Sequence, residues 1–329
     1  MVFVLALTYS LHLVRNSSTK APDFAVRVID ANEPEVVVDI KSGATGYEVA
    51  KLLFINKVTK SISTYFRLAV SDKNSERVSP GSHRLTLSIS AAQALEQLLD
   101  PTRIPNLIKV FEGAWSVEIV DSLLKYGFKQ AEISQAFDSL FLPSGFSNPE
   151  GLLFPAQYSF PQDTTATQML QAMVNRFRSE KIGHEILNDG GEYTPVQLLT
   201  IASIIQAEGD TADFSKVARV ILNRLKISMP LQMDSTVHYI KRVRGQIFLS
   251  TSSTLIDSPY NTYKRYGLPP TPIGNPGVRA MEAALKPAVG DWLYFITVAP
   301  GDTRFTVSHE EFLTWKFLYQ KNRKAGAFN

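Results

Sequence analysis

The pattern of apolar and polar positions in the first hundred residues predicts a small module of strands and helices. Glu35–Ile40 is rich in β-branched residues, which is typical of a strand. Apolar residues recur at helical spacing in Tyr47–Phe54, after a turn that contains two glycines. A second strand is predicted over His83–Ile89, and Ser90 then offers an N-cap for a helix that runs to Leu99.

The region that follows is longer and richer in helices. Leu107–Phe111 is strand-like, and amphipathic helices are predicted up to Tyr126, over Thr165–Lys181 and over Asp213–Leu225. The proline of Asp100-Pro101 stops the preceding helix, because the residue before a proline is disfavoured in helical conformation. We therefore predict two domains with a boundary close to this proline.

The amino-terminal residues Met1–Val14 are mostly apolar. A membrane-spanning helix needs about 20 such residues, and a signal peptide needs a basic start that this run lacks. Three interpretations stay open: a membrane anchor whose start lies upstream, a signal-like segment, and an element packed on the domain. We favour the anchor, so residues 1–15 are assigned to a truncated transmembrane segment and residues 16–34 to a linker.

The best-defined helix lies in the second half of the chain. Thr194 is a good N-cap, Pro195 suits the first helical position, and Gln197 stands where the partner of a capping box belongs. The helix is predicted to end at Glu208, because Gly209 follows as a stop. Glu208 continues an apolar stripe that is formed by Leu198, Ile201, Ala202 and Ile205.

Two physical effects are expected to raise the pKa of Glu208. Partial burial among the isoleucines of the helix disfavours the charged form, and the carbonyl end of a helix carries partial negative charge. A carboxyl group with a raised pKa is suited to act as a general acid near neutral pH. The alternative is a solvated glutamate at a fraying helix end, so the helix alone does not decide its role.

Three segments after this helix are rich in polar and aromatic residues. Residues 229–239 are predicted to form a loop that carries Gln232 and Asp234. Residues 258–263 and 267–277 are rich in Pro, Gly, Asn and Tyr, a composition that does not serve a hydrophobic core. Tyrosine offers an apolar ring with a hydroxyl at its tip, so such loops suit a polar, ring-shaped ligand. The alternative is a set of prolyl turns around a sheet.

The composition narrows the chemistry. The 329 residues include 34 Lys and Arg against 31 Asp and Glu, a balance that argues for a globular protein and against nucleic acid as a partner. The chain has no cysteine, which excludes disulfides, Cys-ligated zinc, iron–sulfur clusters and a thiol nucleophile. Neither a phosphate-binding glycine loop nor a His-Glu-x-x-His string occurs, so no metal or cofactor is expected.

Long strings carry a resemblance to a known family. They are IASIIQAEGD (201–210), VARVILNRLKISMPLQMDSTVHY (217–239), SPYNTYKRYGLPPTPIGNPG (258–277), AALKPAVGDWLYFI (283–296) and, less fully, EGLLFPAQY (150–158). In these strings the chain resembles the YceG-like endolytic peptidoglycan transglycosylases. The resemblance implies an α+β fold, with a LysM-like α/β module over residues 35–104 and a larger mixed α+β catalytic domain over residues 105–325.

The resemblance also implies an activity and a location. Members of the family are lyases that cleave the bond between N-acetylmuramic acid (MurNAc) and N-acetylglucosamine (GlcNAc) within peptidoglycan strands. They leave 1,6-anhydro-MurNAc ends, and we expect this cleavage to end glycan elongation. A single amino-terminal helix anchors them in the cell membrane with the catalytic domain outside. The implied partners are glycan strands, the membrane and peptidoglycan synthases.

The catalytic glutamate of the family is the second acid of an ExE string, and this position falls on Glu208. The first acid is replaced by Gln206, which cannot exchange a proton and so fits Glu208 as the catalyst. Glu208 is expected to protonate the glycosidic oxygen and then, as a carboxylate, to deprotonate the C6 hydroxyl that attacks the anomeric carbon. The candidates for holding the saccharide are Gln232, Asp234, Tyr260, Asn261 and Tyr263. If Asp234 were a second catalytic carboxylate, the products would be reducing ends instead.

Several positions depart from the family pattern. Ala156 and Gln157 replace an Asp-Thr pair, Ser235 replaces a proline, and Phe312 replaces a histidine that usually follows two acids. His309 lies near this last position, and we leave it outside the site because a lone histidine is more often structural.

Two other functions were weighed. A non-catalytic peptidoglycan-binding or scaffold protein of the same fold would be expected to lack the acid, yet Glu208 is present. A penicillin-binding type of acyl enzyme is suggested by Ser122-Leu123-Leu124-Lys125, but the chain has no Lys-Thr-Gly partner for it. The basic cluster Lys241–Arg244 is interpreted as a solvated loop, with binding of acidic glycan or lipid headgroups as the alternative.

Overall fold

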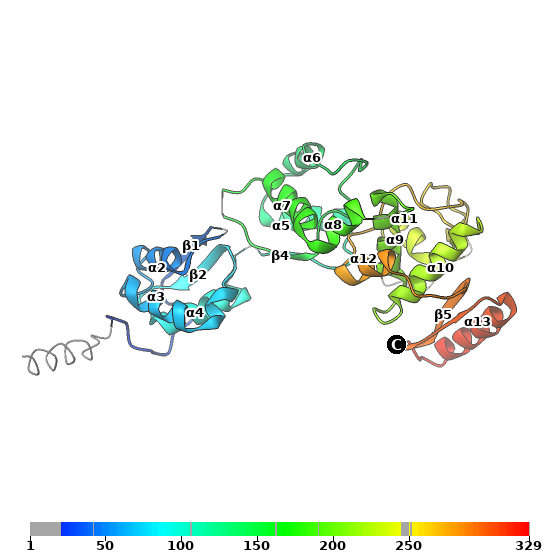
Figure 1. Cartoon of the computed structure of the whole chain (residues 1–329). Helices are drawn as coiled ribbons and strands as arrows, with labels where there is room; N and C mark the ends of the chain where they lie inside the picture. Colours follow the sequence, from blue (N-terminus) through cyan, green and yellow to red (C-terminus); the bar gives the residue numbers. More distant parts are fainter. Residues whose placement is uncertain are drawn as a thin grey trace, which may run out of the picture. The chain divides into compact units, whose positions relative to one another are not determined.

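A computed structural model describes residues 21–41, 43–105, 107–161, 163–189, 191–244, 250 and 252–328, so the expected anchor over residues 1–15 lies outside the described part (Figure 1). The chain forms two compact units. The first ends at Leu107 and takes in Tyr158–Asp163, and the second contains Ile108–Gln157 and the chain from Thr164 onward. Within the described ranges no helix combines the length and the apolar character that a membrane span requires.

The first unit is built on a two-stranded antiparallel sheet. Its strands are β1 (Glu35–Ile40) and β2 (Gly81–Thr86), in a register that places Val38 opposite His83. The helices are α2 (Gly46–Ile55), α3 (Ile62–Ser71) and α4 (Ala91–Leu99), and two short 3-10 helices cover Lys73–Arg77 and Pro101–Arg103. The buried core of this unit includes Val38, Leu53, Tyr65, Leu85 and Leu95.

Local capping explains where the helices of this unit begin. Ser90 Oγ accepts a hydrogen bond from Gln93 N at 3.3 Å, so α4 starts where the sequence predicts it. The hydroxyl of Ser61 caps α3 in the same way, by accepting from Thr64 N at 3.2 Å. α3 was not predicted from the sequence, although Ser61 offers this cap; Tyr65 is its only fully buried residue.

The second unit is mainly helical. Its helices are α5 (Ser116–Tyr126), α6 (Gln130–Asp138), α7 (Ala166–Ser179), α8 (Lys181–Asn188), α9 (Pro195–Glu208), α10 (Phe214–Lys226), α11 (Asp234–Lys241), α12 (Val278–Leu285) and α13 (His309–Lys324). The strands pair as β3 (Ile108–Val110) with β4 (Ala156–Tyr158) and β5 (Tyr294–Ala299) with β6 (Asp302–Thr306), and a 3-10 helix covers Ser253–Leu255. The mixed α+β class is confirmed.

Helix α9 lies at the centre of this unit. Its capping box is formed as predicted, since Gln197 N donates to Thr194 Oγ1 at 3.3 Å and Thr194 N donates to Gln197 Oε1 at 2.9 Å. The expected one-sided apolar stripe is wrong, because every residue from Leu198 to Ile205 is buried. Helices α8, α10, α11 and α12 all pack against α9 and leave it no solvent face over this stretch (Figure 1).

The helix predicted over Thr165–Lys181 is interrupted near its end. Glu180 is extended, so α7 ends at Ser179 and α8 starts at Lys181 in a new direction. Gly183 allows the two helices to approach closely, since a Cβ at this position would lie 1.7 Å from the carbonyl oxygen of Phe177.

The carboxyl-terminal part forms a small layer of its own. β5 and β6 pair antiparallel, and α13 packs along β5 (Figure 1). α13 has no fully buried residue. One side of this helix therefore remains available to line a cleft.

Candidate active site

Glu208 is the last residue of α9, and its carboxyl group contacts the start of another helix. The backbone N–H of Ser235, in the first turn of α11, donates to Glu208 Oε1 at 2.9 Å. The first turn of a helix has free N–H groups and partial positive charge, which stabilise an anion. Glu208 is thus held in place rather than solvated at a frayed end.

The pKa of Glu208 is raised above its ordinary value of 4.5, as the sequence predicts. Burial is the largest cause, and the hydrogen bonding to Ser235 opposes it by favouring the carboxylate. Among the charged neighbours, Asp234 raises the pKa of Glu208 by repulsion and Arg224 lowers it by attraction. The site therefore makes Glu208 harder to ionise than a solvated glutamate, and it also provides partners for the ionised form.

Asp234 lies on a helix, which corrects the prediction of a loop over residues 229–239. It is the first residue of α11, and Met233 before it provides no side-chain cap, so the usual sequence signal of a helix start is missing. The hydroxyl of Tyr263 donates a short hydrogen bond to Asp234 Oδ1. Burial and the nearby Asp234 raise the pKa of Tyr263 far above its ordinary value, so the hydroxyl keeps its proton.

Four of the predicted site residues meet in one cleft with a volume of about 650 Å³. They are Glu208, Gln232, Asp234 and Tyr263. The opposite side of the cleft comes from β5 and α13 and is largely aromatic. Its lining includes Tyr294, Phe295, His309, Phe312, Lys316 and Tyr319.

Gln232 has an exposed side chain and an unusual backbone. Its φ of +50° lies in the left-handed region, which non-glycine residues rarely adopt. The backbone N–H of Gln232 donates to Thr262 O at 3.1 Å and thereby ties this strained residue to the 258–263 segment. The surrounding loops therefore present the amide side chain at the edge of the cleft.

Asn261 and Tyr260 are not among the residues that line this cleft. Asn261 is 0% exposed, and its amide nitrogen donates to Thr254 O and Ile256 O while its Oδ1 accepts from Tyr263 N. Asn261 therefore shapes the loop that carries Tyr263, and its buried side chain is not placed to contact a saccharide as predicted. Tyr260 donates or accepts a 2.7 Å bond with Thr271 Oγ1 instead.

The aromatic side of the cleft contains residues that the sequence analysis did not select. Phe312 stacks on Tyr294 with ring centroids 5.3 Å apart, and His309, which we left outside the site, packs against Tyr294 at the same distance. His309, Phe312, Lys316 and Tyr319 recur at helical spacing along α13. This periodicity was the signal that could have assigned them to one face.

Gln206, which departs from the family pattern, connects α9 to the loop before α12. Its Oε1 accepts from Gly277 N at 2.9 Å. The carboxyl group of Glu112 lies against Gly277, where a Cβ would come within 2.1 Å of the Glu112 carboxyl carbon. A neutral amide at position 206 therefore avoids a second negative charge beside Glu112.

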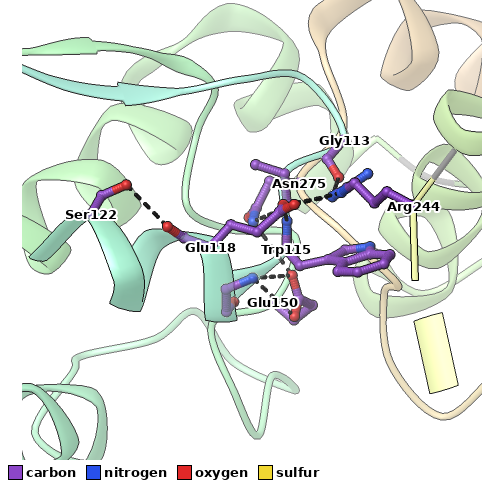
Figure 2. A network of polar contacts seen from close by, with 9 residues as sticks. Gly113, Trp115, Glu118, Ser122, Glu150, Arg244 and Asn275 are labelled. Carbon is purple, nitrogen blue, oxygen red and sulfur yellow. Dashed lines mark hydrogen bonds and ion pairs between the residues drawn. The ribbon is translucent and has the colours of Figure 1, made fainter. Parts of the chain in front are cut away.

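A second buried carboxyl group, Glu150, was also missed, although it opens the quoted string EGLLFPAQY. It is 5% exposed, and its oxygens accept from Ser116 N at 3.0 Å and Tyr239 Oη at 3.1 Å. Asn275 Nδ2, which lies beside Glu150 in Figure 2, donates to it at 3.4 Å. Burial raises the pKa of Glu150 to about 7. Since Tyr239 belongs to α11, Glu150 fastens the helix whose first turn binds Glu208.

Lys241, Arg242 and Arg244 are exposed, as predicted for a solvated segment, and they also contact protein groups. Arg244 donates to both carboxylate oxygens of Glu118, at 2.5 and 2.6 Å, and to Gly113 O at 2.7 Å (Figure 2). Its guanidinium lies 3.9 Å from the ring centroid of Trp115. Lys241 donates to Ser253 Oγ, and Arg242 lies over the ring of Tyr239.

Comparison with known proteins gives consistent results. Residues 38–316 match the YceG-like family. The chain is 33% identical over 314 residues to a Bacillus subtilis protein named endolytic murein transglycosylase, with 88% of this chain and 86% of that protein covered. A Streptococcus pneumoniae D39 protein of the same name is 29% identical over 321 residues, which cover 86% of this chain and 58% of that protein. A crystal structure of a yceG-like protein from Listeria monocytogenes has a TM-score of 0.57 and 26% identity, over 85% of this chain and 98% of that one.

Proposed function

Since this protein belongs to the YceG-like family and is an enzyme of the lytic transglycosylase class, we propose that it cleaves peptidoglycan strands internally. The bond cut is the one between MurNAc and GlcNAc, and the new end is a 1,6-anhydro-MurNAc. The observation that carries the proposal is Glu208 itself, a carboxyl group of raised pKa in a cleft of about 650 Å³. The names of the relatives at 29–33% identity support murein as the substrate.

The proposed reaction uses one carboxyl group twice. Protonated Glu208 donates its proton to the glycosidic oxygen as the bond to the anomeric carbon breaks. The resulting carboxylate, which the N–H of Ser235 stabilises, then accepts the proton of the C6 hydroxyl of the same MurNAc. The C6 oxygen forms the new bond to the anomeric carbon, so no water is consumed and the proton returns to Glu208.

Asp234 has a supporting role in this proposal. The hydroxyl of Tyr263 donates to Asp234 Oδ1 and holds this carboxyl group in place. Its negative charge is close enough to affect Glu208 and stabilises the positive charge that develops at the anomeric carbon. If Glu208 carries out both proton transfers and Asp234 takes no part in them, the product is an anhydro end.

The aromatic wall suits a chain of sugar rings. Tyr294 and Phe312 present stacked rings along the cleft, and the apolar faces of sugars pack on such rings while their hydroxyls bond to polar side chains. The exposed amide of Gln232 supplies polar contacts on the other side. An open cleft of this kind accepts an internal segment of a strand and not only its end.

The cellular setting is part of the same proposal. We place the catalytic unit outside the cell membrane, held by an amino-terminal anchor, because peptidoglycan is assembled there. Cleavage of a nascent strand would end its elongation beside the synthases that extend it. The apolar run Met1–Val14 supports this location.

The experiment is a digestion of uncrosslinked glycan strands with the full chain, followed by mass spectrometry of the products. Anhydro ends are expected, and they are lighter by one water than the reducing ends that a hydrolase leaves. Glu208→Gln is expected to give no product, whereas Glu192→Gln, which changes an exposed glutamate, retains activity. Binding of the strands without cleavage by the unaltered protein would support the scaffold alternative, and reducing ends would refute the proposed product.

A further inference from the structure

Arg224 on α10 is a buried cation that nevertheless lines the catalytic cleft. Its side chain is only 6% exposed, and it belongs to the same cleft lining as Glu208. A buried charge is costly unless it is paired or hydrogen-bonded. Arg224 is accordingly hydrogen-bonded to backbone carbonyl groups.

Two donors of the guanidinium reach the two sides of the cleft. Nε donates to Leu293 O at 2.6 Å, directly before β5, and Nη1 donates a short hydrogen bond to Leu231 O, directly before Gln232. The guanidinium carbon Cζ lies 5.5 Å from the ring centroid of Tyr294, in the aromatic wall. One side chain thus connects β5 to the segment that leads into α11.

Neighbouring residues on α10 hold only the β5 side. Asn223 Nδ2 donates to Trp292 O at 2.9 Å, and Arg219 Nε donates to Ala288 O at 2.5 Å. These bonds fasten the connector between α12 and β5 to α10, and neither residue is part of the cleft lining. Arg219 is therefore a suitable control for Arg224, because it also bonds to the connector between α12 and β5 but does not line the cleft.

The charge of Arg224 also acts on the catalytic acid. Its attraction lowers the pKa of Glu208 and opposes the effect of burial. In the proposed reaction Glu208 must be a carboxylate halfway through, at the moment when it accepts the C6 proton. The positive charge of Arg224 stabilises the carboxylate form of Glu208 and does not compete for the proton, since arginine stays charged in proteins.

We propose that Arg224 is a positioning residue of the reaction, which sets the separation of the two cleft walls and stabilises the ionised form of Glu208. This inference rests on the proposed function. The two effects can be tested independently. The distance between the cleft walls depends on the several N–H donors of the guanidinium, whereas the stabilisation of Glu208 depends only on a positive charge. Lysine supplies the charge without the guanidinium, and glutamine supplies neither.

The experiment compares Arg224→Lys, Arg224→Gln and Arg219→Gln in the full chain. The first measurement needs no substrate: the side-chain carboxyl of Glu208 is titrated by carbon-13 NMR, with Glu208→Gln to assign the signal. Arg224→Gln is expected to move the Glu208 midpoint up, because an opposite charge is lost. Arg224→Lys and Arg219→Gln are expected to leave it near the unaltered value.

The second measurement is the rate of glycan cleavage against pH. Arg224→Lys is expected to raise KM about tenfold, as for loss of a charge-assisted hydrogen bond. The pH at which kcat falls to half its maximum is expected to stay the same in this variant. Arg224→Gln is expected to raise KM and also to move this midpoint of kcat to higher pH. A Glu208 midpoint that is equal in Arg224→Gln and the unaltered protein would overturn the inference, and so would an unchanged KM in Arg224→Lys. If the unaltered protein cleaves no glycan, the proposed function fails, while the NMR titration still tests the effect of Arg224 on Glu208.

Discussion

Replacement of the buried Glu150 by glutamine is expected to stabilise the second unit above neutral pH. Glu150 is 5% exposed and hydrogen-bonded on all sides by donors from Ser116, Tyr239 and Asn275. Glutamine has the same shape: its amide oxygen still accepts from Ser116 N, and its NH₂ group donates to the hydroxyl oxygen of Tyr239. The substitution thus removes a buried charge with little loss of hydrogen bonding.

The size of the effect follows from the pKa of Glu150, which rises from an ordinary value of 4.5 to about 7 in the folded chain. Each pKa unit corresponds to about 1.4 kcal/mol, so the difference amounts to about 3 kcal/mol. A raised carboxyl pKa means that Glu150 binds its proton more tightly in the folded state than in the unfolded state. The contribution of Glu150 to stability is therefore full below pH 4.5 and is lost as the pH rises to about 7.

The assay is urea unfolding followed by tryptophan fluorescence at several pH values between 4.5 and 8. The chain has three tryptophans, Trp115, Trp292 and Trp315, and all of them belong to the second unit, so the signal reports on that unit alone. The free energy of unfolding of Glu150→Gln relative to the unaltered protein should rise by up to about 3 kcal/mol across this range. The exposed substitution Glu192→Gln serves as the control. A difference between Glu150→Gln and the unaltered protein that stays constant with pH would refute the reasoning.

Three further results are expected. The kcat of the unaltered protein should fall with rising pH at a midpoint above the ordinary carboxyl value of 4.5, since the protonated form of Glu208 is the acid; a profile that falls at or below this value would contradict that role. Tyr263→Phe removes the hydroxyl that binds Asp234 and should lower kcat about tenfold with folding retained, and an unchanged kcat would show that this bond is dispensable. Ser90→Ala removes the cap of α4 and should destabilise the first unit by about 1 kcal/mol in circular-dichroism melting, with cleavage unaffected; a loss of cleavage would argue against a purely structural cap.

Much of the fold follows from local signals in the sequence. Thr194 and Ser90 mark the starts of α9 and α4, because an N-cap hydroxyl bonds to a backbone N–H only three residues away. Where such signals are absent, prediction fails. α11 has no side-chain cap and was expected to be a loop. α3 was overlooked although the hydroxyl of Ser61 caps it, so a cap signal alone does not reveal every helix.

The candidate site was predictable to a similar extent. The strings around Glu208 identify the catalytic candidate and bring Gln232, Asp234 and Tyr263 into consideration, and the structure places all four in one cleft. Asn261 has the same polar character in the sequence, yet its amide nitrogen donates to backbone carbonyl groups of its own loop. Residue type alone does not distinguish a side chain that faces a ligand from one that satisfies buried carbonyl groups.

The sequence by itself determined that a carboxyl group ends a capped, apolar helix, and from this that the pKa of Glu208 is raised. The cap and the apolar run are local and predict the direction of the shift, whereas burial, its largest cause, is produced by the helices that pack around α9. Only the tertiary structure decided which groups surround that carboxyl: the N–H of Ser235 on α11, the cation of Arg224 on α10, and the aromatic wall of β5 and α13. These groups are far apart in the chain, and they meet because helices pack around α9, a matter of side-chain shape over the whole unit rather than of local pattern.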